Sequence, residues 1–189
     1  MFWLPEAVRE GRTLLVVVIW IIGLSGAGKT TLGREVARQW RATSPNCVLL
    51  DGDELREVFR HNMAEAAYTV SGRRLNAERM TALCSLLDGQ GINVVCCLLS
   101  IFPEMRSANR HRFSGYFEVF LEAPLSVLKA RDAKGLYAAA EAGKTRDVVG
   151  IDIPFERPTG SDLVIDTSGE PADLPGLAAR VLRQAGVTA

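Results

Sequence analysis

The chain has 189 residues, and 48% of them are hydrophobic, which suits one domain with a sizeable core. Its 22 basic and 22 acidic residues balance without any block of like charge, so neither nucleic acid nor an anionic membrane is expected as a partner. The four cysteines include no C-x-x-C pair, which indicates reduced core thiols in a cytosolic protein.

An apolar run at residues 14–22 follows Arg9 and Arg12, an order that is also found in signal peptides. Cleavage after this run would destroy the glycine-rich segment that comes next. The run is also shorter than the roughly 20 residues that span a bilayer. We therefore interpret residues 14–22 as a strand buried on both faces, preceded by a lead-in at residues 1–12 with a short helical piece.

The next segment, GLSGAGKT at residues 23–30, matches the phosphate-loop pattern G-x-x-x-x-G-K-[ST]. Apolar residues at helical spacing predict a helix at residues 31–41. Backbone N–H groups of such a loop, with the helix N-terminus, bind phosphate oxygens. We therefore predict an ATP site in which Lys29 reaches the β- and γ-phosphates and the Thr30 hydroxyl ligates Mg²⁺. The predicted nucleotide-binding residues of the loop are Gly23, Ser25, Gly26, Ala27, Gly28, Lys29, Thr30 and Thr31.

A short apolar run at residues 47–50 predicts a second strand, and Asp51 and Asp53 follow directly after it. Acidic residues at the carboxyl end of a parallel strand face the ligand crevice of an open α/β sheet. We predict helices at residues 54–60 and 71–88, the longer of which ends near Gly89 and Gly91. Its predicted core face comprises Leu75, Met80, Leu83, Leu86 and Leu87.

The rest of the chain alternates strands and helices, which indicates a parallel sheet covered on both faces. Residues 132–160 break this alternation and contain one weak helical piece, at residues 136–142. A long irregular segment inside an α/β protein is usually functional or disordered, and in a phosphoryl-transfer enzyme it would serve as a lid over the nucleotide. Further strands are predicted at residues 92–99, 116–121 and 163–165, and further helices at residues 104–114, 124–131 and 174–184.

These elements predict one α/β domain, residues 1–189, with a phosphate-loop kinase fold: a parallel five-stranded sheet, helices on both faces and a lid at about residues 132–160. No N-K-x-D guanine-reading motif is present, which argues against a GTPase. The chain is too small for a typical motor ATPase core with its sensor elements. A small-molecule kinase fits the length, the lid and the sheet best.

Further motifs narrow the class of kinase. LDGDELR at residues 50–56, Arg73 with Asn76, Ser100, RDAKGLY at residues 131–137 and GID at residues 150–152 follow the phosphate loop in this order. In this the chain resembles the adenylylsulfate kinase family, from about residue 17 to residue 166. The resemblance implies Mg²⁺-ATP as donor and the 3′-hydroxyl of adenylylsulfate as acceptor, a reaction of sulfate assimilation. It also implies a cytoplasmic location and, as in many members, a homodimer.

The resemblance also implies roles for single residues. Asp53 would act beside the acceptor hydroxyl as base or orienter, and Asp51 would support the metal through water. Arg56 and Arg73 would hold the anionic part of the acceptor, since a guanidinium fork matches phosphate or sulfate oxygens. The resulting sets are Lys29, Asp51 and Asp53 for catalysis; Thr30 and Asp51 for the metal; Arg131 and Lys134 for ATP, with the loop; and Asp53, Arg56, Arg73, Asn76, Ser100 and Lys134 for the acceptor.

The chain departs from the family where the acceptor base would lie. The family places one phenylalanine ahead of Arg73 and another ahead of Gly150, and the two sandwich the adenine. This chain has AAYTVSG at residues 66–72 and DVVG at residues 147–150, and Gly72 replaces a family aspartate. Stacking on an aromatic ring is worth about 1–3 kcal/mol per base, so adenine binding should weaken unless Tyr68 or Phe155 substitutes.

These departures are similar to a divergent branch of the family that includes a kinase for cytidine diphosphoramidate, linked to capsule modification. Two acceptors therefore stay open, adenylylsulfate first and cytidine diphosphoramidate second. A non-catalytic nucleotide-binding module is a third reading, which the intact Lys29, Thr30, Asp51 and Asp53 oppose. A kinase for an unrelated nucleoside monophosphate or sugar is disfavoured by the pair of Arg73 and Asn76.

Overall fold

A computed structural model describes residues 16–60, 65–132, 134–169 and 173–187. The predicted lead-in at residues 1–12 lies outside these ranges. The described residues form one sheet of five parallel strands in the order β2-β3-β1-β4-β5. This confirms the predicted α/β fold with a parallel five-stranded sheet. The strands are β1 (Val18–Ile22), β2 (Cys47–Asp51), β3 (Asn93–Leu98), β4 (Tyr116–Glu122) and β5 (Leu163–Asp166).

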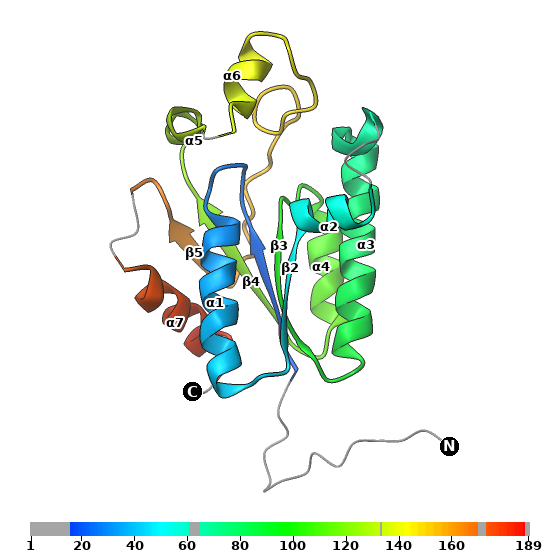
Figure 1. The fold of residues 1–189 in the computed structure, drawn as a ribbon, viewed down its shortest axis with the longest axis vertical. Coiled ribbons are helices and arrows are strands. Elements are labelled where there is room, and N and C mark those ends of the chain that lie inside the picture. Colours follow the sequence, from blue (N-terminus) through cyan, green and yellow to red (C-terminus); the bar gives the residue numbers. More distant parts are fainter. Residues whose placement is uncertain (1–15, 61–64, 133, 170–172, 188–189) are drawn as a thin grey trace, which may run out of the picture.

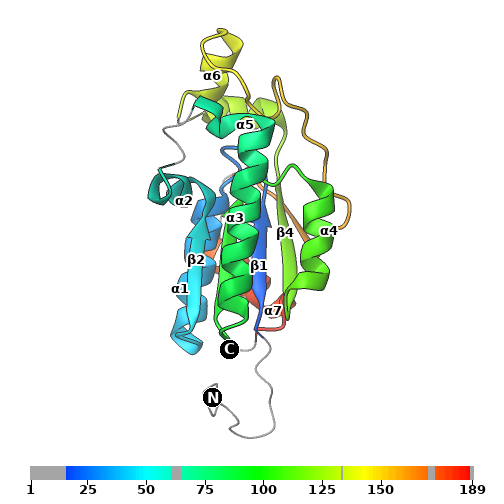
Figure 2. The same cartoon turned by 90° about the vertical axis from the view of Figure 1, so that its right-hand side faces the viewer.

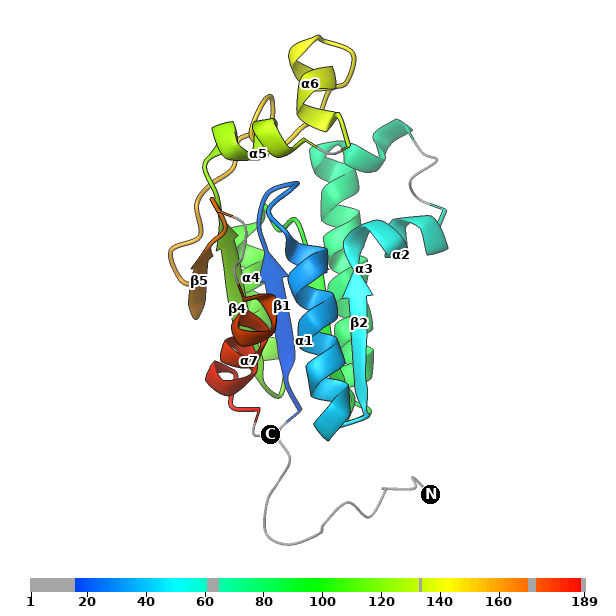
Figure 3. The same ribbon diagram turned by 60° about the vertical axis from the view of Figure 1, so that its left-hand side comes forward.

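Helices cover both faces of the sheet, as Figures 1 and 2 show. α1 (Lys29–Thr43) and α7 (Leu174–Gln184) lie on one face, and α3 (Val70–Asp88) and α4 (Pro103–Arg112) lie on the other. α5 (Leu125–Arg131) and α6 (Leu136–Glu141) lie beyond the carboxyl ends of the strands, next to the loop between β1 and α1 (Figure 3). α2 (Gly52–Val58) follows β2 directly. Among the described residues, no helix combines the length and apolar character that crossing a bilayer requires.

The central strand β1 contributes side chains to two hydrophobic cores. Ile19 and Ile21 point into the core beneath α1 and α7, whereas Val18, Trp20 and Ile22 point into the core beneath α3 and α4. Successive side chains of a strand point to opposite faces, so a strand buried on both faces must be apolar at every position. This explains why β1 reads as an unbroken apolar run.

The buried face of α3 differs from the predicted one. Met80 is buried as expected, but Leu75 and Leu86 are 39% and 58% exposed, so their assignment to the core was wrong. Leu83 and Leu87 are partly buried and pack against the core as predicted. The most deeply buried positions, with spacings of three and four residues, lie on a neighbouring face of the helix. That face carries polar residues in its first turns, which lie near the carboxyl ends of the strands. The buried residues are Gly72, Arg73, Asn76, Ala77, Met80, Thr81 and Cys84.

One contact between α1 and β3 leaves no room for a side chain. A Cβ added to Gly33 would lie 2.2 Å from the Cys97 sulfur. The Cys97 thiol donates to the carbonyl of Lys29 at 3.3 Å, which fixes the sulfur beneath the first turn of α1.

We expect Gly33→Ala to lower the free energy of unfolding by about 1–3 kcal/mol, because the added methyl group overpacks this contact. Adding Cys97→Ala should recover most of the loss, since it removes the obstructing sulfur. Urea unfolding of the single and double variants measures both effects, with Gly160→Ala, which meets nothing within 4 Å, as the matched control. Equal stability of Gly33→Ala and the wild type would contradict the packing described.

Candidate active site

The glycine-rich loop links the end of β1 to the start of α1. Gly28 is the N-cap residue of α1 and has a φ of 92°, a left-handed conformation that favours glycine. The loop therefore leads into the helix with its N–H groups and the positive end of the helix dipole at the carboxyl edge of the sheet. Such an arrangement binds phosphate oxygens.

Asp51 joins this loop to β2. Its Oδ2 accepts a hydrogen bond of 2.6 Å from the Thr30 hydroxyl, and its Oδ1 accepts one of 2.9 Å from the backbone N–H of Asp53. The second bond caps α2, which therefore begins at Gly52, two residues earlier than predicted. Asp51 is buried, so the loop, the carboxylate and the start of α2 form one connected unit.

Thr30 and Asp51 together offer hard oxygen ligands of the kind that Mg²⁺ prefers. Within the described ranges, no group of three or more His, Cys, Asp or Glu residues is placed to hold a metal ion. The oxygens of Thr30 and Asp51 therefore fit a magnesium ion that arrives with the nucleotide, completed by phosphate oxygens and water.

Lys29 lies over the loop, with its Nζ donating to the Leu24 carbonyl at 2.8 Å. Burial of the ammonium group lowers its pKa from 10.5 to about 8, although the carboxylates of Asp53 and Asp51 oppose the shift. The buried ammonium group is suited to binding phosphate, because a buried cation is attracted to an anionic partner more strongly than an exposed one.

Asp53 lies between three cations. Its Oδ1 contacts Arg56 Nη1 at 2.8 Å, and its Oδ2 contacts the Nζ of Lys134 at 3.1 Å. Partial burial pushes the pKa of Asp53 upward, but the Lys134 hydrogen bond and the charges of Lys134, Arg56 and Lys29 outweigh it and hold that pKa below its usual value. The carboxylate is therefore ionised at neutral pH, as a group that accepts a proton or a hydrogen bond must be.

Beyond Arg56 Nη1, three buried nitrogen atoms find no hydrogen-bond partner among the residues that the structure describes: Arg56 Nε, Arg73 Nε and Asn76 Nδ2. Burial, followed by the neighbouring Arg56 charge, lowers the pKa of Arg73. The Tyr68 ring lies against both guanidiniums, with its centroid 5.2 Å from Arg56 and 5.8 Å from Arg73. Buried donors without partners are costly, so this group of residues is suited to an anionic ligand with many oxygens.

The replacement at Gly72 has a steric explanation. A Cβ at this position would lie 2.0 Å from the Ala66 carbonyl oxygen and 2.8 Å from that of Ala67. The short 3₁₀ turn (Glu65–Tyr68) therefore packs so closely on the first turn of α3 that only glycine fits. This turn carries Tyr68, so Gly72 helps to hold the aromatic ring against the two arginines.

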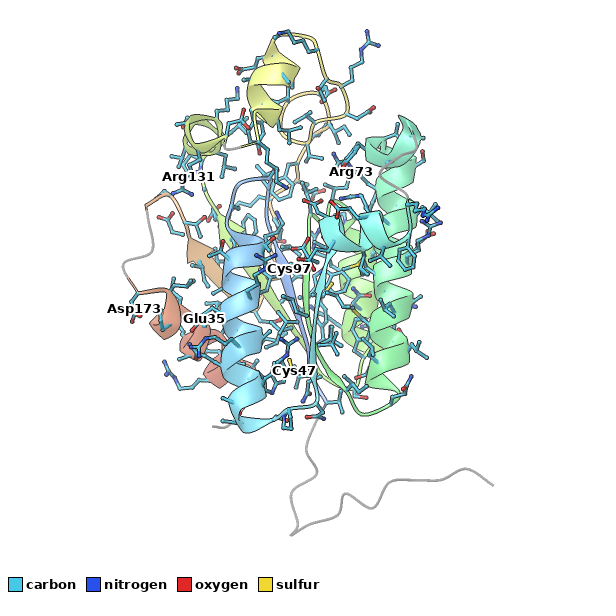
Figure 4. The ribbon with its side chains drawn as sticks, in the orientation of Figure 1. Glu35, Cys47, Arg73, Cys97, Arg131 and Asp173 are labelled. Carbon is cyan, nitrogen blue, oxygen red and sulfur yellow. The ribbon has the colours of Figure 1, made fainter. Side chains whose placement is uncertain are left out.

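A cavity of about 200 Å³ lies beside α1, on the side of the phosphate loop away from Arg56 and Arg73. Arg131 lines it and donates to the carbonyls of Ser168 and Gly169, at 2.9 and 3.0 Å. Arg131 and Arg73 thus lie on opposite sides of the carboxyl edge of the sheet (Figure 4). The cavity lining is mainly apolar, as a base requires, and comprises Ala27, Gly28, Thr31, Leu32, Leu121, Arg131, Ile165, Thr167, Gly169, Leu174 and Leu177.

Two further predicted site residues, Ser100 and Lys134, have contacts within the protein. Ser100 is buried, and its carbonyl accepts a hydrogen bond of 3.0 Å from Arg106, so the contact seen here is with its own loop. Lys134, which was expected to contact both ATP and the acceptor, contacts the Asp53 carboxylate.

Tyr137 was not among the predicted site residues. It is buried, and its hydroxyl donates to the carbonyl of Ser25 in the phosphate loop at 2.9 Å. Burial raises its pKa to about 12, so it remains a neutral donor. Tyr137 ends the RDAKGLY motif, and its position in that motif was the signal available in the sequence. Through this contact α6 rests on the phosphate loop.

The aromatic residues proposed as substitutes for the family phenylalanines, and the valines at one of those positions, differ in burial and in contacts. Val148 and Val149, which stand where the family motif has its second phenylalanine and the following residue, are both buried. Phe155 packs on Phe120 with ring centroids 6.0 Å apart. Tyr68 is 44% exposed, so its ring covers the two arginines on one side and is open to solvent elsewhere.

Comparison with known proteins identifies relatives along most of the chain. The family model described as adenylylsulphate kinase matches residues 15–166. An adenylyl-sulfate kinase of Paraburkholderia xenovorans is 40% identical over 157 residues, which cover 82% of this chain and 86% of the relative. A cytidine diphosphoramidate kinase of Campylobacter jejuni is 38% identical over 151 residues, covering 80% and 86% respectively.

The fold has a close counterpart among solved structures. The APS kinase of Mycobacterium tuberculosis in complex with AMPPNP and APS superposes with a TM-score of 0.80 at 30% identity, covering 90% of this chain and 98% of that one.

The lowered pKa of Lys29 predicts a pH dependence. The ammonium group binds phosphate only when charged, and it loses its charge as the pH rises through about 8. We expect kcat/KM for ATP to fall on the alkaline side with an apparent pKa near that value, since this parameter reports groups of the free enzyme. In Lys29→Arg the guanidinium stays charged, so this alkaline decline should disappear. A decline that persists unchanged in Lys29→Arg would assign it to another group.

Proposed function

This chain belongs to the adenylylsulphate kinase family, and we propose that it transfers the γ-phosphoryl group of Mg²⁺-ATP to the 3′-hydroxyl of a nucleotide-linked anhydride. As a kinase it is a phosphotransferase that acts on a hydroxyl acceptor. The observation that supports this reaction best is the placement of two carboxylates. Asp51 is bonded to Thr30 of the phosphate loop, and Asp53 lies two residues further, between the loop and the buried arginines.

Phosphoryl transfer depends on positioning and charge neutralisation more than on covalent help from the protein. Thr30 and Asp51 would hold Mg²⁺, which supplies charge neutralisation at the transferring group. Lys29 would leave the Leu24 carbonyl and clamp the β- and γ-phosphates. Asp53 would accept a hydrogen bond from the 3′-hydroxyl, orient it toward the γ-phosphorus and take its proton.

The two sides of the sheet edge suggest where each nucleotide lies. The apolar cavity beside Arg131 suits the base of ATP, because it adjoins Gly28 and Thr31 of the loop. Arg56, Arg73 and Asn76 would bind the anhydride of the acceptor, and Tyr68 would stack on its base. We further propose that α6 and the rest of the lid segment exclude water from the transfer, since Tyr137 already contacts the loop.

Two acceptors fit this arrangement. Adenylylsulfate comes first because of the family. Cytidine diphosphoramidate is supported by the acceptor side, where one exposed ring, Tyr68, is present and Val148 is buried in the core. A cytoplasmic location and a homodimer follow from the resemblance and are part of the same proposal.

The proposal is tested by following ADP release with each anhydride as acceptor. We expect at least one of them to give acceptor-dependent ADP release. Lys29→Ala should lower kcat/KM by about a hundredfold to a thousandfold, because a clamp on the transferring group is lost. The exposed Lys144 offers a matched control, since Lys144→Ala should leave the rate unchanged. ATP binding without turnover of either acceptor would favour a nucleotide-binding module instead.

The stacking role of Tyr68 has its own test. Tyr68→Ala should raise KM for the acceptor by about fivefold to a hundredfold while KM for ATP stays the same, because base stacking is worth about 1–3 kcal/mol. Tyr68→Phe keeps the ring and should behave like the wild type. If Tyr68→Ala changes neither KM, the acceptor base lies elsewhere.

A further inference from the structure

Residues 147–153 form a tight loop at the acceptor side that is held by its own hydrogen bonds. The Asp152 carboxylate accepts the N–H groups of Asp147 and Val148, each at 2.5 Å. Gly150 donates to the carbonyl of Ile153 at 2.8 Å, and Val149 forms a β-bridge with Ile153. These bonds hold the backbone at Asp147 in place.

Asp147 has a φ of 63°, in the left-handed region that side chains other than glycine rarely adopt. Aspartate tolerates this region better than most residues, but glycine would occupy it without cost. A residue that keeps a side chain under such conditions is a candidate for a functional role when it also lies at a site.

Asp147 contacts Arg73, and this contact places it at the site. Its carbonyl accepts a hydrogen bond of 2.8 Å from Arg73 Nη2, whereas Arg73 Nε is buried without a partner among the residues described. The side chain of Asp147 is half-buried, and its carboxylate has no hydrogen bond or ion pair with the residues that the structure describes. The nearby carboxylate also opposes the burial that lowers the pKa of Arg73.

We propose that Asp147 selects the acceptor by its terminal group, favouring one that carries N–H donors over one that carries only oxygen atoms. This inference rests on the proposed function and places the nucleoside diphosphoramidate ahead of adenylylsulfate, the acceptor that the family alone would favour. The terminal group that binds Arg73 would donate a hydrogen bond from its amide nitrogen to the Asp147 carboxylate.

The two candidate acceptors differ in the hydrogen-bonding atoms of their terminal groups, which explains the selection. Arg56, Arg73 and Asn76 supply donors, which suit the oxygen atoms of both a sulfate and a phosphoramidate group. A carboxylate at the edge of this set repels a group that has only acceptors, and it satisfies a group that has an N–H. Discrimination by an unpaired charge against the wrong ligand is a common device of specific sites.

Two variants separate the charge of Asp147 from its capacity to accept a hydrogen bond. Asp147→Asn keeps the shape, tolerates the left-handed backbone and removes only the charge. Asp147→Gly removes both and suits the backbone, so neither variant should unfold the loop. Calorimetry gives the Kd of adenylylsulfate, cytidine diphosphoramidate and cytidine diphosphate, the last of which has the same base but an oxygen in place of the amide nitrogen.

For Asp147→Gly we expect the Kd of cytidine diphosphoramidate to rise about fivefold, the equivalent of one lost hydrogen bond. The Kd of adenylylsulfate and of cytidine diphosphate should fall about threefold to fivefold, because a repulsive charge is removed. Asp147→Asn should tighten the two oxygen-only ligands similarly and leave the diphosphoramidate nearly unchanged. Glu156→Gln, which neutralises an exposed acid further along the same segment, should alter none of the three.

Equal changes for all three ligands in Asp147→Gly would overturn the inference and leave the proposed kinase intact. Weaker binding of cytidine diphosphate together with the diphosphoramidate would assign the carboxylate to the base and would also overturn it. If the wild type binds none of the anhydrides, the proposed function and this inference both fall.

Discussion

The carboxylate of Asp51 is the point on which the site depends. It is buried at the end of β2, where it accepts the Thr30 hydroxyl with one oxygen and the Asp53 N–H with the other. One side chain therefore fixes the first turn of α1, the first turn of α2 and the direction of the next acidic residue. Parallel strands end at the same edge of the sheet. The hydrogen bond between Thr30 and Asp51 therefore holds the phosphate loop close to the residues proposed to bind the acceptor.

The residues proposed to bind the acceptor lower the stability of the protein itself. Two guanidiniums and an amide are buried with nitrogen atoms that lack partners within the described part of the chain, and burial lowers the pKa of Arg73. Buried donors of this kind destabilise a fold unless something binds them. Their persistence beside Asp53 is consistent with a ligand that carries several oxygen atoms, and the close packing of Gly72 on the 3₁₀ turn keeps Tyr68 beside them.

Local patterns in the sequence were sufficient for the strands, the phosphate loop and the order of helices, because a doubly covered parallel strand and a glycine-rich turn each have a distinct composition. They were not sufficient for the orientation of α3. Its exposed Leu75 and Leu86 are more apolar than the buried Arg73, Asn76 and Thr81, so apolar character alone does not identify the face that packs on the sheet. The bond from Tyr137 to Ser25 spans 112 positions of the chain, and no local pattern predicts a contact of that separation.

The four thiols offer a practical consequence. All of them are buried, and desolvation raises the pKa of Cys47 to about 11 and that of Cys97 to about 12. Thiols that stay protonated and enclosed react slowly with maleimides. A single cysteine introduced on the outer surface of α6 would therefore accept a fluorophore selectively, without first replacing the native ones. The fluorescence of that label, followed while nucleotide is added, would report whether α6 changes its surroundings.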